Sequence, residues 1–290
     1  MNESDRPNPL RWRNEAPMDG IFLNPGDQDG LSLLDLPVGL QPKRPPALAA
    51  GAVASAEVKA FVERILESLH NVRAADAAIV LDCSRLAVAD RRMLADILGE
   101  GEVCIVAGGE GVTQVVESTL TGVWQVLGSG EDGATVVDRI EIGAVPRIVR
   151  EIALAGAAQP APLPDPLPEG VMNAPPVIAE AAARAREWQP GVDNHVINFT
   201  LLPMNAADAG LIAHCLGQAP LLILSQGYGA ARVLSTAVRH IWAVQYMNST
   251  GKIILDTLEI GDVPQAALAA AEDFEDSAKR LAEIIAAYLV

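Results

Sequence analysis

Residues 123–146 (VWQVLGSGEDGATVVDRIEIGAVP) recur 118 positions later as residues 241–264 (IWAVQYMNSTGKIILDTLEIGDVP). Extending the comparison backwards aligns Ile79–Pro146 with Ile197–Pro264 without a gap. About 19 of the 68 aligned pairs are identical, whereas roughly five are expected by chance. The identities collect at glycines, prolines and tryptophans, including Trp124 with Trp242. The chain is therefore predicted to contain two copies of one structural unit.

Each copy predicts the same elements in the same order: helix, strand, helix, strand, three-stranded meander, helix. This order favours an α+β fold with helices on one face of the sheet, and a pseudo-twofold axis relating the two copies. Gly99 and Gly217 are expected to end helices, and Asp132-Gly133 and Thr250-Gly251 to form hairpin turns. The expected ranges are Ala56–Val72, Ile79–Leu81, Ala89–Leu98, Val103–Val106, Val112–Leu120, Val123–Leu127 and Ala134–Ile142, then Pro176–Trp188, Val196–Phe199, Ala207–Leu216, Leu221–Leu224, Ala230–Val238, Ile241–Met247 and Lys252–Ile260.

Proline and glycine mark the domain boundaries. Residues 1–54 are rich in both and predict an irregular N-terminal segment. The first repeat unit is expected over 55–158 and the second over 176–290. Residues 159–175 between them form a proline-rich linker.

Composition excludes several classes of protein. Half of the 290 residues are hydrophobic, which is enough for a sizeable core, and the net charge of -16 disfavours nucleic acid as a partner. From the polar, proline-bearing start of the sequence we expect no signal peptide, and no apolar run is long enough to predict a membrane span. Three widely spaced cysteines indicate buried thiols in a reducing compartment. We expect a cytoplasmic protein.

No motif indicates catalysis. The four histidines share no metal-ligand spacing with one another or with the cysteines. Gly108-Gly109-Glu110-Gly111 has no basic residue after it, so a turn explains it better than a phosphate-binding loop. We expect no catalytic residue, no bound metal and no cofactor.

The second copy carries polar and aromatic residues that the first lacks. Residues kept in both copies are expected to serve the fold, whereas residues gained by one copy are better candidates for function. Alternation along 240–247 places His240, Trp242 and Tyr246 on one strand face. The candidate partner-binding residues of this region are Arg232, Arg239, His240, Trp242, Tyr246 and Asn248.

An acidic helix follows the second copy, over about Val263–Leu289. Its apolar residues recur at helical spacing, and its solvent side gathers Glu272, Asp273, Glu275 and Asp276. A solvated face explains these charges, and a docking site for a basic segment is the rival interpretation. The four acids complete the predicted partner-binding set.

Three stretches resemble the hydrogenase expression/formation proteins of the HupH/HyaF type: Ile241–Asn248 (IWAVQYMN), Leu255–Val263 (LDTLEIGDV) and Ala271–Ile284 (AEDFEDSAKRLAEI). Leu36–Pro46 (LPVGLQPKRPP) is similar to the proline-rich lead of that family. The resemblance implies an accessory protein in the maturation of an uptake NiFe hydrogenase. Such a protein acts as a chaperone for a subunit precursor, the iron–sulfur small subunit, before assembly and export, together with other maturation proteins.

A second class of function stays open, namely a small-molecule or metal-handling enzyme with its site between the two repeats. A deep polar pocket at the junction of the copies would favour the enzyme. A shallow polar and aromatic face on the second copy would favour the chaperone.

Overall fold

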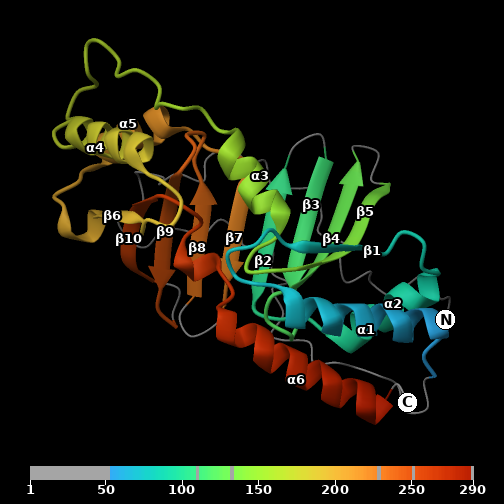
Figure 1. Ribbon diagram of the computed structural model, residues 1–290. Coiled ribbons are helices and arrows are strands. Elements are labelled where there is room, and N and C mark those ends of the chain that lie inside the picture. Colours follow the sequence, from blue (N-terminus) through green and yellow to red (C-terminus); the bar gives the residue numbers. More distant parts are fainter. Residues whose placement is uncertain (1–52, 109–110, 131–133, 227–229, 250–251, 289–290) are drawn as a thin grey trace.

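The computed structural model describes residues 53–108, 111–130, 134–226, 230–249 and 252–288 (Figure 1). Over these ranges the chain is an α+β protein with six helices, α1 to α6, and an antiparallel sheet. Most of the predicted irregular N-terminal segment, and the predicted turns at Asp132-Gly133 and Thr250-Gly251, lie outside the described residues.

The first half contains the predicted order of elements, with boundaries within a few residues of those expected. Its elements are α1 (Ala56–Asn71), β1 (Ile79–Asp82), α2 (Val88–Leu98), β2 (Val103–Gly108), β3 (Gly111–Glu117), β4 (Val123–Gly130), β5 (Thr135–Ile142) and α3 (Arg147–Ala155).

The second half repeats this order with two additional 3-10 turns. Its elements are α4 (Ala174–Glu187), β6 (His195–Asn198), η2 (Phe199–Leu201), α5 (Ala206–Leu216), β7 (Leu221–Ser225), β8 (Ala230–Ser235), β9 (Ile241–Met247), β10 (Ile253–Ile260), η3 (Gln265–Ala267) and α6 (Ala271–Tyr288).

The ten strands of the described ranges form one sheet in the order β1-β5-β4-β3-β2-β7-β8-β9-β10-β6. The order is the same from either end once each strand is exchanged for its counterpart in the other half. The halves join where β2 pairs with β7, and there Ile105 lies opposite Ile223, the residue 118 positions later. Other ladders follow the same offset, since Val115 pairs with Val126 and Val233 with Val244.

Helices cover both faces of the sheet, so the expectation of helices on one face is wrong. Neighbouring residues of a strand point to opposite faces, and on β4 they enter different cores. Trp124 packs with α3 and with strands of both halves, whereas Val123 packs with α1, α2 and α6. A third core joins α4 and α5 to β9 and β10. In Figure 1, α3 crosses the middle of the sheet, and the other two helix groups lie toward its ends.

The predicted helix ends are confirmed at Gly99 and Gly217, whose φ angles are +62° and +59°. Each of these two helices, α2 and α5, carries an aspartate near its start, at equivalent positions of the two halves, and each aspartate binds the start of the preceding helix. Asp90 accepts a hydrogen bond from Ser55, the N-cap of α1. Its counterpart Asp208 accepts one from the backbone N–H of Ala174, the first residue of α4.

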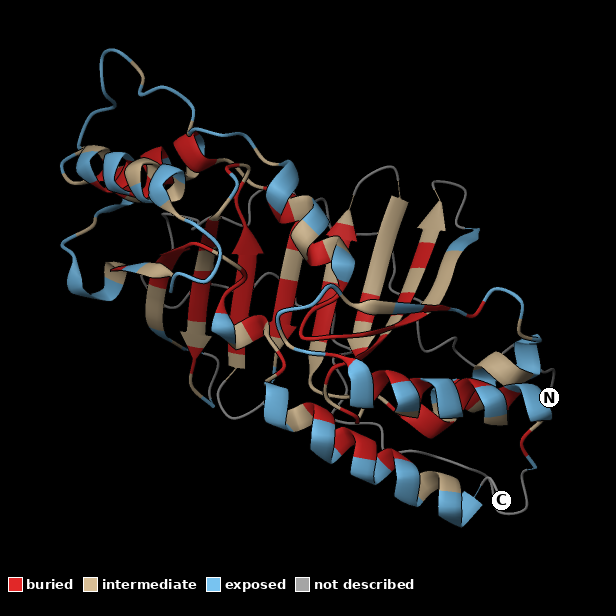
Figure 2. Ribbon diagram, in the orientation of Figure 1, coloured by how far each residue is buried: buried red, intermediate tan, exposed pale blue. Residues whose placement is uncertain are grey.

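The C-terminal helix differs most from expectation. It begins at Ala271 rather than near Val263, and it packs against α1 of the first half through Phe274, Ala278 and Leu281. The chain crosses between the halves over residues 268–270, which stay outside the helix, and the Ala269 N–H donates to Ala144 O at 2.9 Å. Figure 2 shows α6 with its buried side toward the molecule and its other side exposed.

Candidate functional site

The predicted alternation is confirmed within β9, but His240 lies in the turn before the strand, so its expected place on the face of Trp242 and Tyr246 is wrong. Trp242 and Tyr246 join the core beneath α3, while Ile241 and Ala243 join the core beneath α4 and α5. Trp242 is 1% exposed, so it is an element of the core, and Tyr246 is half-buried. Burial raises the pKa of Tyr246, and the nearby charge of Glu259 raises it further.

Arg232 lies on the opposite face of the sheet from Trp242 and Tyr246. It forms a row with Gln245 and Asp256 across β8, β9 and β10. Its Nη1 donates to Gln245 Oε1 at 3.3 Å, and Gln245 Nε2 donates to Asp256 Oδ2 at 3.4 Å. Burial lowers the pKa of Arg232 and raises the pKa of Asp256. The structure therefore separates Arg232 from the aromatic residues with which it was grouped.

His240 occupies a left-handed backbone conformation, with φ of +65°, where the first half has Gly122. A non-glycine residue in this region carries strain, and such residues cluster at functional sites. The His240 ring lies 4.7 Å from the ring of Trp188, and Nδ1 is 3.2 Å from Gly261 O. Arg239 beside it is exposed.

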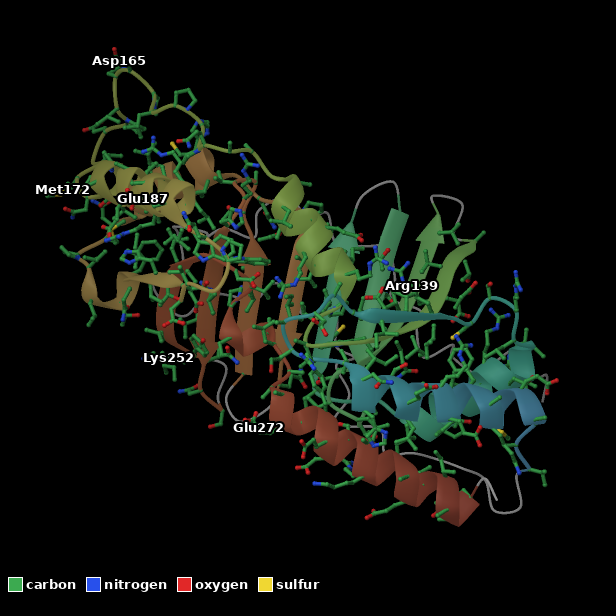
Figure 3. The ribbon with its side chains drawn as sticks, in the orientation of Figure 1. Arg139, Asp165, Met172, Glu187, Lys252 and Glu272 are labelled. Carbon is green, nitrogen blue, oxygen red and sulfur yellow. The ribbon has the colours of Figure 1, made fainter. Side chains whose placement is uncertain are left out.

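Asn248 lies at the other end of β9 from His240. Its Oδ1 accepts from the Lys252 N–H at 2.9 Å, and its backbone N–H donates to Lys252 O. Both bonds span the β9–β10 turn, so the side chain has a structural task there. Figure 3 labels Lys252 beside this turn.

The four acids of α6 are carried away from β9, because α6 runs along α1 of the first half (Figures 1 and 3). Glu272, Glu275 and Asp276 are exposed. Asp273 Oδ2 accepts from the Ala270 N–H at 3.0 Å, which starts the helix, and Asp276 pairs with Lys279. The ten predicted residues thus lie in three places: the two faces of β8–β10, including its turns, and α6.

One row of residues paired across neighbouring strands differs between the two halves. The sequence comparison had assigned its conserved members to the fold and not to function. Across β3, β4, β5 and β1 it reads Glu117, Trp124, Glu141 and Val80. Across β8, β9, β10 and β6 the corresponding row reads Ser235, Trp242, Glu259 and Val196.

In the first half every polar group of this row has a partner. Trp124 Nε1 donates to Gly143 O at 2.9 Å. Glu141 accepts from Arg139 Nε at 2.6 Å and from the Arg147 N–H, at the start of α3, at 2.7 Å. Glu117 Oε1 accepts from the Gly122 N–H at 3.0 Å. Figure 3 labels Arg139 on β5.

In the second half the same row is incomplete. Ser235 Oγ and Trp242 Nε1 are buried and have no hydrogen-bond partner among the residues that the structure describes. Thr257 stands where the first half has Arg139, and no ion pair joins Glu259 to a cation in the described residues. Burial raises the pKa of Glu259, and a hydrogen bond from Asn194 offsets part of that effect.

Sequence reasoning missed Glu259 because it searched for residues gained by the second copy. Glu259 is kept, and what changes is its surroundings, since Arg139 becomes Thr257 and Glu117 becomes Ser235. That loss of a charge partner is visible in the aligned sequences and was the available signal.

The junction between the halves is apolar on the face beneath α3. Ile105, Ala107, Leu221 and Ile223 are each buried to 1% exposure or less where β2 meets β7. Within the described ranges, no three His, Cys, Asp or Glu side chains are grouped so that they could hold a metal ion. No helix in the part of the chain that the structure describes is long and apolar enough to cross a membrane.

Comparisons with known proteins agree on one family. The model of the "HupH hydrogenase expression protein, C-terminal conserved region" matches residues 55–154 and again residues 171–288. The chain is 40% identical to the hydrogenase expression/formation protein HupQ of Azotobacter chroococcum, over 89% of this chain and 92% of that protein. It is 36% identical to HoxQ of Cupriavidus necator, over 94% and 98% of the two chains.

More distant relatives have similar names. The hydrogenase-1 operon protein HyaF of Escherichia coli is 30% identical, over 91% of this chain and 94% of that one. A solved HupH structure from Thiobacillus denitrificans aligns with 39% of this chain and 95% of its own, at 21% identity and a TM-score of 0.37. The family model spans most of the chain, and the sequence relatives span nearly all of it. The chain belongs to the HupH/HyaF family of hydrogenase expression/formation proteins.

Proposed function

We propose that this protein is a non-catalytic accessory protein in the maturation of an uptake NiFe hydrogenase. It binds the precursor of a hydrogenase subunit, the iron–sulfur small subunit, in the cytoplasm before assembly and export. The relatives are named for hydrogenase expression and formation, which supports the maturation role.

We further propose that the two units, 55–158 and 176–290 on either side of the linker 159–175, arose by duplication and are related by a pseudo-twofold axis. The symmetric strand order and the shared ladder registers support this. In a duplicated protein with one altered copy, one half can supply stability while the altered half binds the partner.

The observation that carries the assignment of the binding half is the incomplete row of the second half. Buried polar groups without partners cost free energy, about 1–3 kcal/mol each. All three such side-chain atoms among the described residues, Arg232 Nε, Ser235 Oγ and Trp242 Nε1, lie in the second half. Together with the strained His240, they mark the half that has departed from optimal stability.

The proposed contact surface extends along β9, from Arg239 and His240 at one end of the strand to Tyr246 and Asn248 at the other. Trp242 supports it from the core. Arg232 serves the opposite face of the same strands, and the acids of α6 form a second contact region for basic segments of the partner.

The test is a binding titration between the purified protein and a fluorescently labelled precursor of the hydrogenase small subunit. Tyr246→Ala is expected to weaken binding about thirtyfold, because aromatic anchors of interfaces are often worth 2 kcal/mol or more. Tyr288→Ala removes a 61% exposed tyrosine at the end of α6 and is the matched control, expected to change affinity less than twofold.

Glu272→Lys with Glu275→Lys tests the acids of α6 without touching Asp273, whose carboxylate starts the helix. A loss of affinity that grows at low salt is expected from a charged contact. Absence of precursor binding by the unaltered protein, or equal losses from Tyr246→Ala and Tyr288→Ala, would refute the proposed surface.

A further inference from the structure

Glu141 and Glu259 are the same residue of the repeat in two electrostatic situations. Glu141 is fully buried and accepts from the guanidinium of Arg139 and from the N-terminus of α3. Glu259 is 9% exposed, lacks both contacts, and takes an amide hydrogen bond from Asn194. The nearby Arg150 is bonded to Asp262 at 2.6 Å. A largely buried carboxylate without a cation is costly, and an arginine is the side chain that satisfied it in the first half.

Glu259 lies on β10, one strand in from the edge of the sheet that β6 forms. Val196 pairs with Glu259 across β6 and β10, so their side chains lie on one face. β6 is the last strand of the sheet, and no other described strand pairs with its outer side. Val196 is 51% exposed, and it lies between Glu259 and the outer side of β6.

Exposed apolar side chains lie on β6 and on segments that adjoin it in the chain or in the sheet. They lie in the loop before β6, in β6 itself, in and after η2, and in β10. They are Val192 (58% exposed), Val196, Leu201 (79%), Leu202 (38%) and Ile254 (58%). An extended polypeptide that adds to a sheet edge gains main-chain hydrogen bonds there and places alternate side chains on each face.

We infer that Glu259 is the acceptor for an arginine side chain of a bound extended polypeptide, which lies along β6 and reaches Glu259 over Val196. This rests on the proposed function for the identity of the polypeptide. A residue beside Val196 is two strand spacings from Glu259, about 10 Å, which the side chains of an arginine and a glutamate span together. The guanidinium provides the charge that Arg139 provides to Glu141, and apolar residues beside it cover the exposed edge.

The decisive variant supplies the arginine from within the chain. Val196→Arg places a guanidinium opposite Glu259 at an exposed position, so Glu259 is occupied before any partner arrives. Val80→Arg is its matched control, because Val80 lies opposite Glu141, is 37% exposed, and Glu141 already holds Arg139. Glu259→Gln removes the acceptor charge, and Glu63→Gln removes an exposed charge from α1 as its control.

Two measurements use these variants. In the titration with the small-subunit precursor, Val196→Arg and Glu259→Gln are each expected to weaken binding at least about tenfold, as for loss of one charge-assisted hydrogen bond. Val80→Arg and Glu63→Gln stay within twofold. Adding Val196→Arg to Glu259→Gln causes little further loss, since both act on one carboxylate.

The second measurement does not involve the precursor. The indole N–H resonance of Trp242, assigned with Trp242→Phe, is followed while N-acetyl-arginine amide is added, with the uncharged N-acetyl-citrulline amide as control. A saturable shift with the arginine compound alone, lost in Val196→Arg and kept in Val80→Arg, is expected.

The outcomes separate the two proposals. Arginine-dependent shifts without precursor binding would refute the proposal that the small-subunit precursor is the partner, and would support the arginine site. Precursor binding that survives Glu259→Gln, with no arginine-specific shift, would overturn the arginine site and leave the proposed function standing.

Discussion

Replacing Gly122 with alanine tests whether α6, encoded at the end of the second half, completes the first half. Gly122 has φ of +81°, and a Cβ at this position would overlap Cε1 of the Phe274 ring. Phe274 is 3% exposed and belongs to the core of α1, α2 and α6, so its ring has little freedom to move away.

The expected loss has two sources. A left-handed conformation costs an alanine about 1–2 kcal/mol, and overpacking a well-packed core costs about 1–3 kcal/mol. Gly122→Ala should therefore lower the free energy of unfolding by about 2–5 kcal/mol, a large share of the 5–15 kcal/mol typical of whole proteins. Urea unfolding followed by circular dichroism measures it, provided that the transition is two-state.

Two further variants make the result specific. Gly210→Ala, in α5, has nothing within 4 Å of the added Cβ and should gain up to about 1 kcal/mol from helix propensity. Phe274→Leu should relieve the overlap, so that the double variant loses about 1–3 kcal/mol less than the two single losses added together. Additive losses, or a Gly122→Ala loss below 1 kcal/mol, would show that α6 does not lie on Gly122.

Two predictions concern thiol and carboxyl chemistry. Burial raises the pKa of Cys83 to about 12 and of Cys104 to about 11, and also raises the pKa of Cys215. A thiol reagent at pH 8 should therefore label the folded protein at least about a hundredfold more slowly than the unfolded chain, and fast labelling of any of the three when folded would contradict this burial. Burial of Asp208 would raise its pKa, but backbone N–H groups of Met172, Ala174, Asn173 and Asn205 together hold it below the usual value. The stabilisation by Asp208 is then complete above the unfolded pKa of about 3.9 and is lost as pH falls through the lower folded pKa. Asp208→Asn should unfold more easily at pH 7, with a difference from the parent that shrinks below pH 4, and a difference that is constant with pH would contradict the role of the charge.

The order of elements followed from the sequence because it depends on local signals. Alternation set the strands, and glycine at Gly99 and Gly217 ended two helices. The repeat added a second constraint, because the elements predicted for one copy must also fit the sequence of the other. The path of α6 carried no such signal, since the crossing over residues 268–270 is determined by a partner surface, α1, that lies about 200 residues earlier in the chain.

The candidate site was predicted in part, for a related reason. Tyr246, His240 and Arg239 stood out because they are additions to the second copy. Glu259 did not, since its residue type is unchanged and only its neighbours differ. A comparison between repeats therefore needs two questions: which polar residues are new, and which retained polar residues have lost their partner.

The packing of α6 on the first half is connected with the missing hydrogen-bond partners in the second half. Phe274 of α6 packs against Gly122, where a side chain would not fit. The counterpart of Gly122 is His240, whose ring instead lies on Trp188 and whose Nδ1 faces Gly261 O. In the first half the equivalent carbonyl, Gly143 O, accepts from Trp124, so His240 takes the acceptor that Trp242 would need. Because the chain leaves the second half after η3 to complete the first, Glu259 also lacks the helix N-terminus that Glu141 has. The path of α6 that completes the first half thus leaves Glu259, the residue on which the proposed arginine site depends, without the helix N-terminus that Glu141 has.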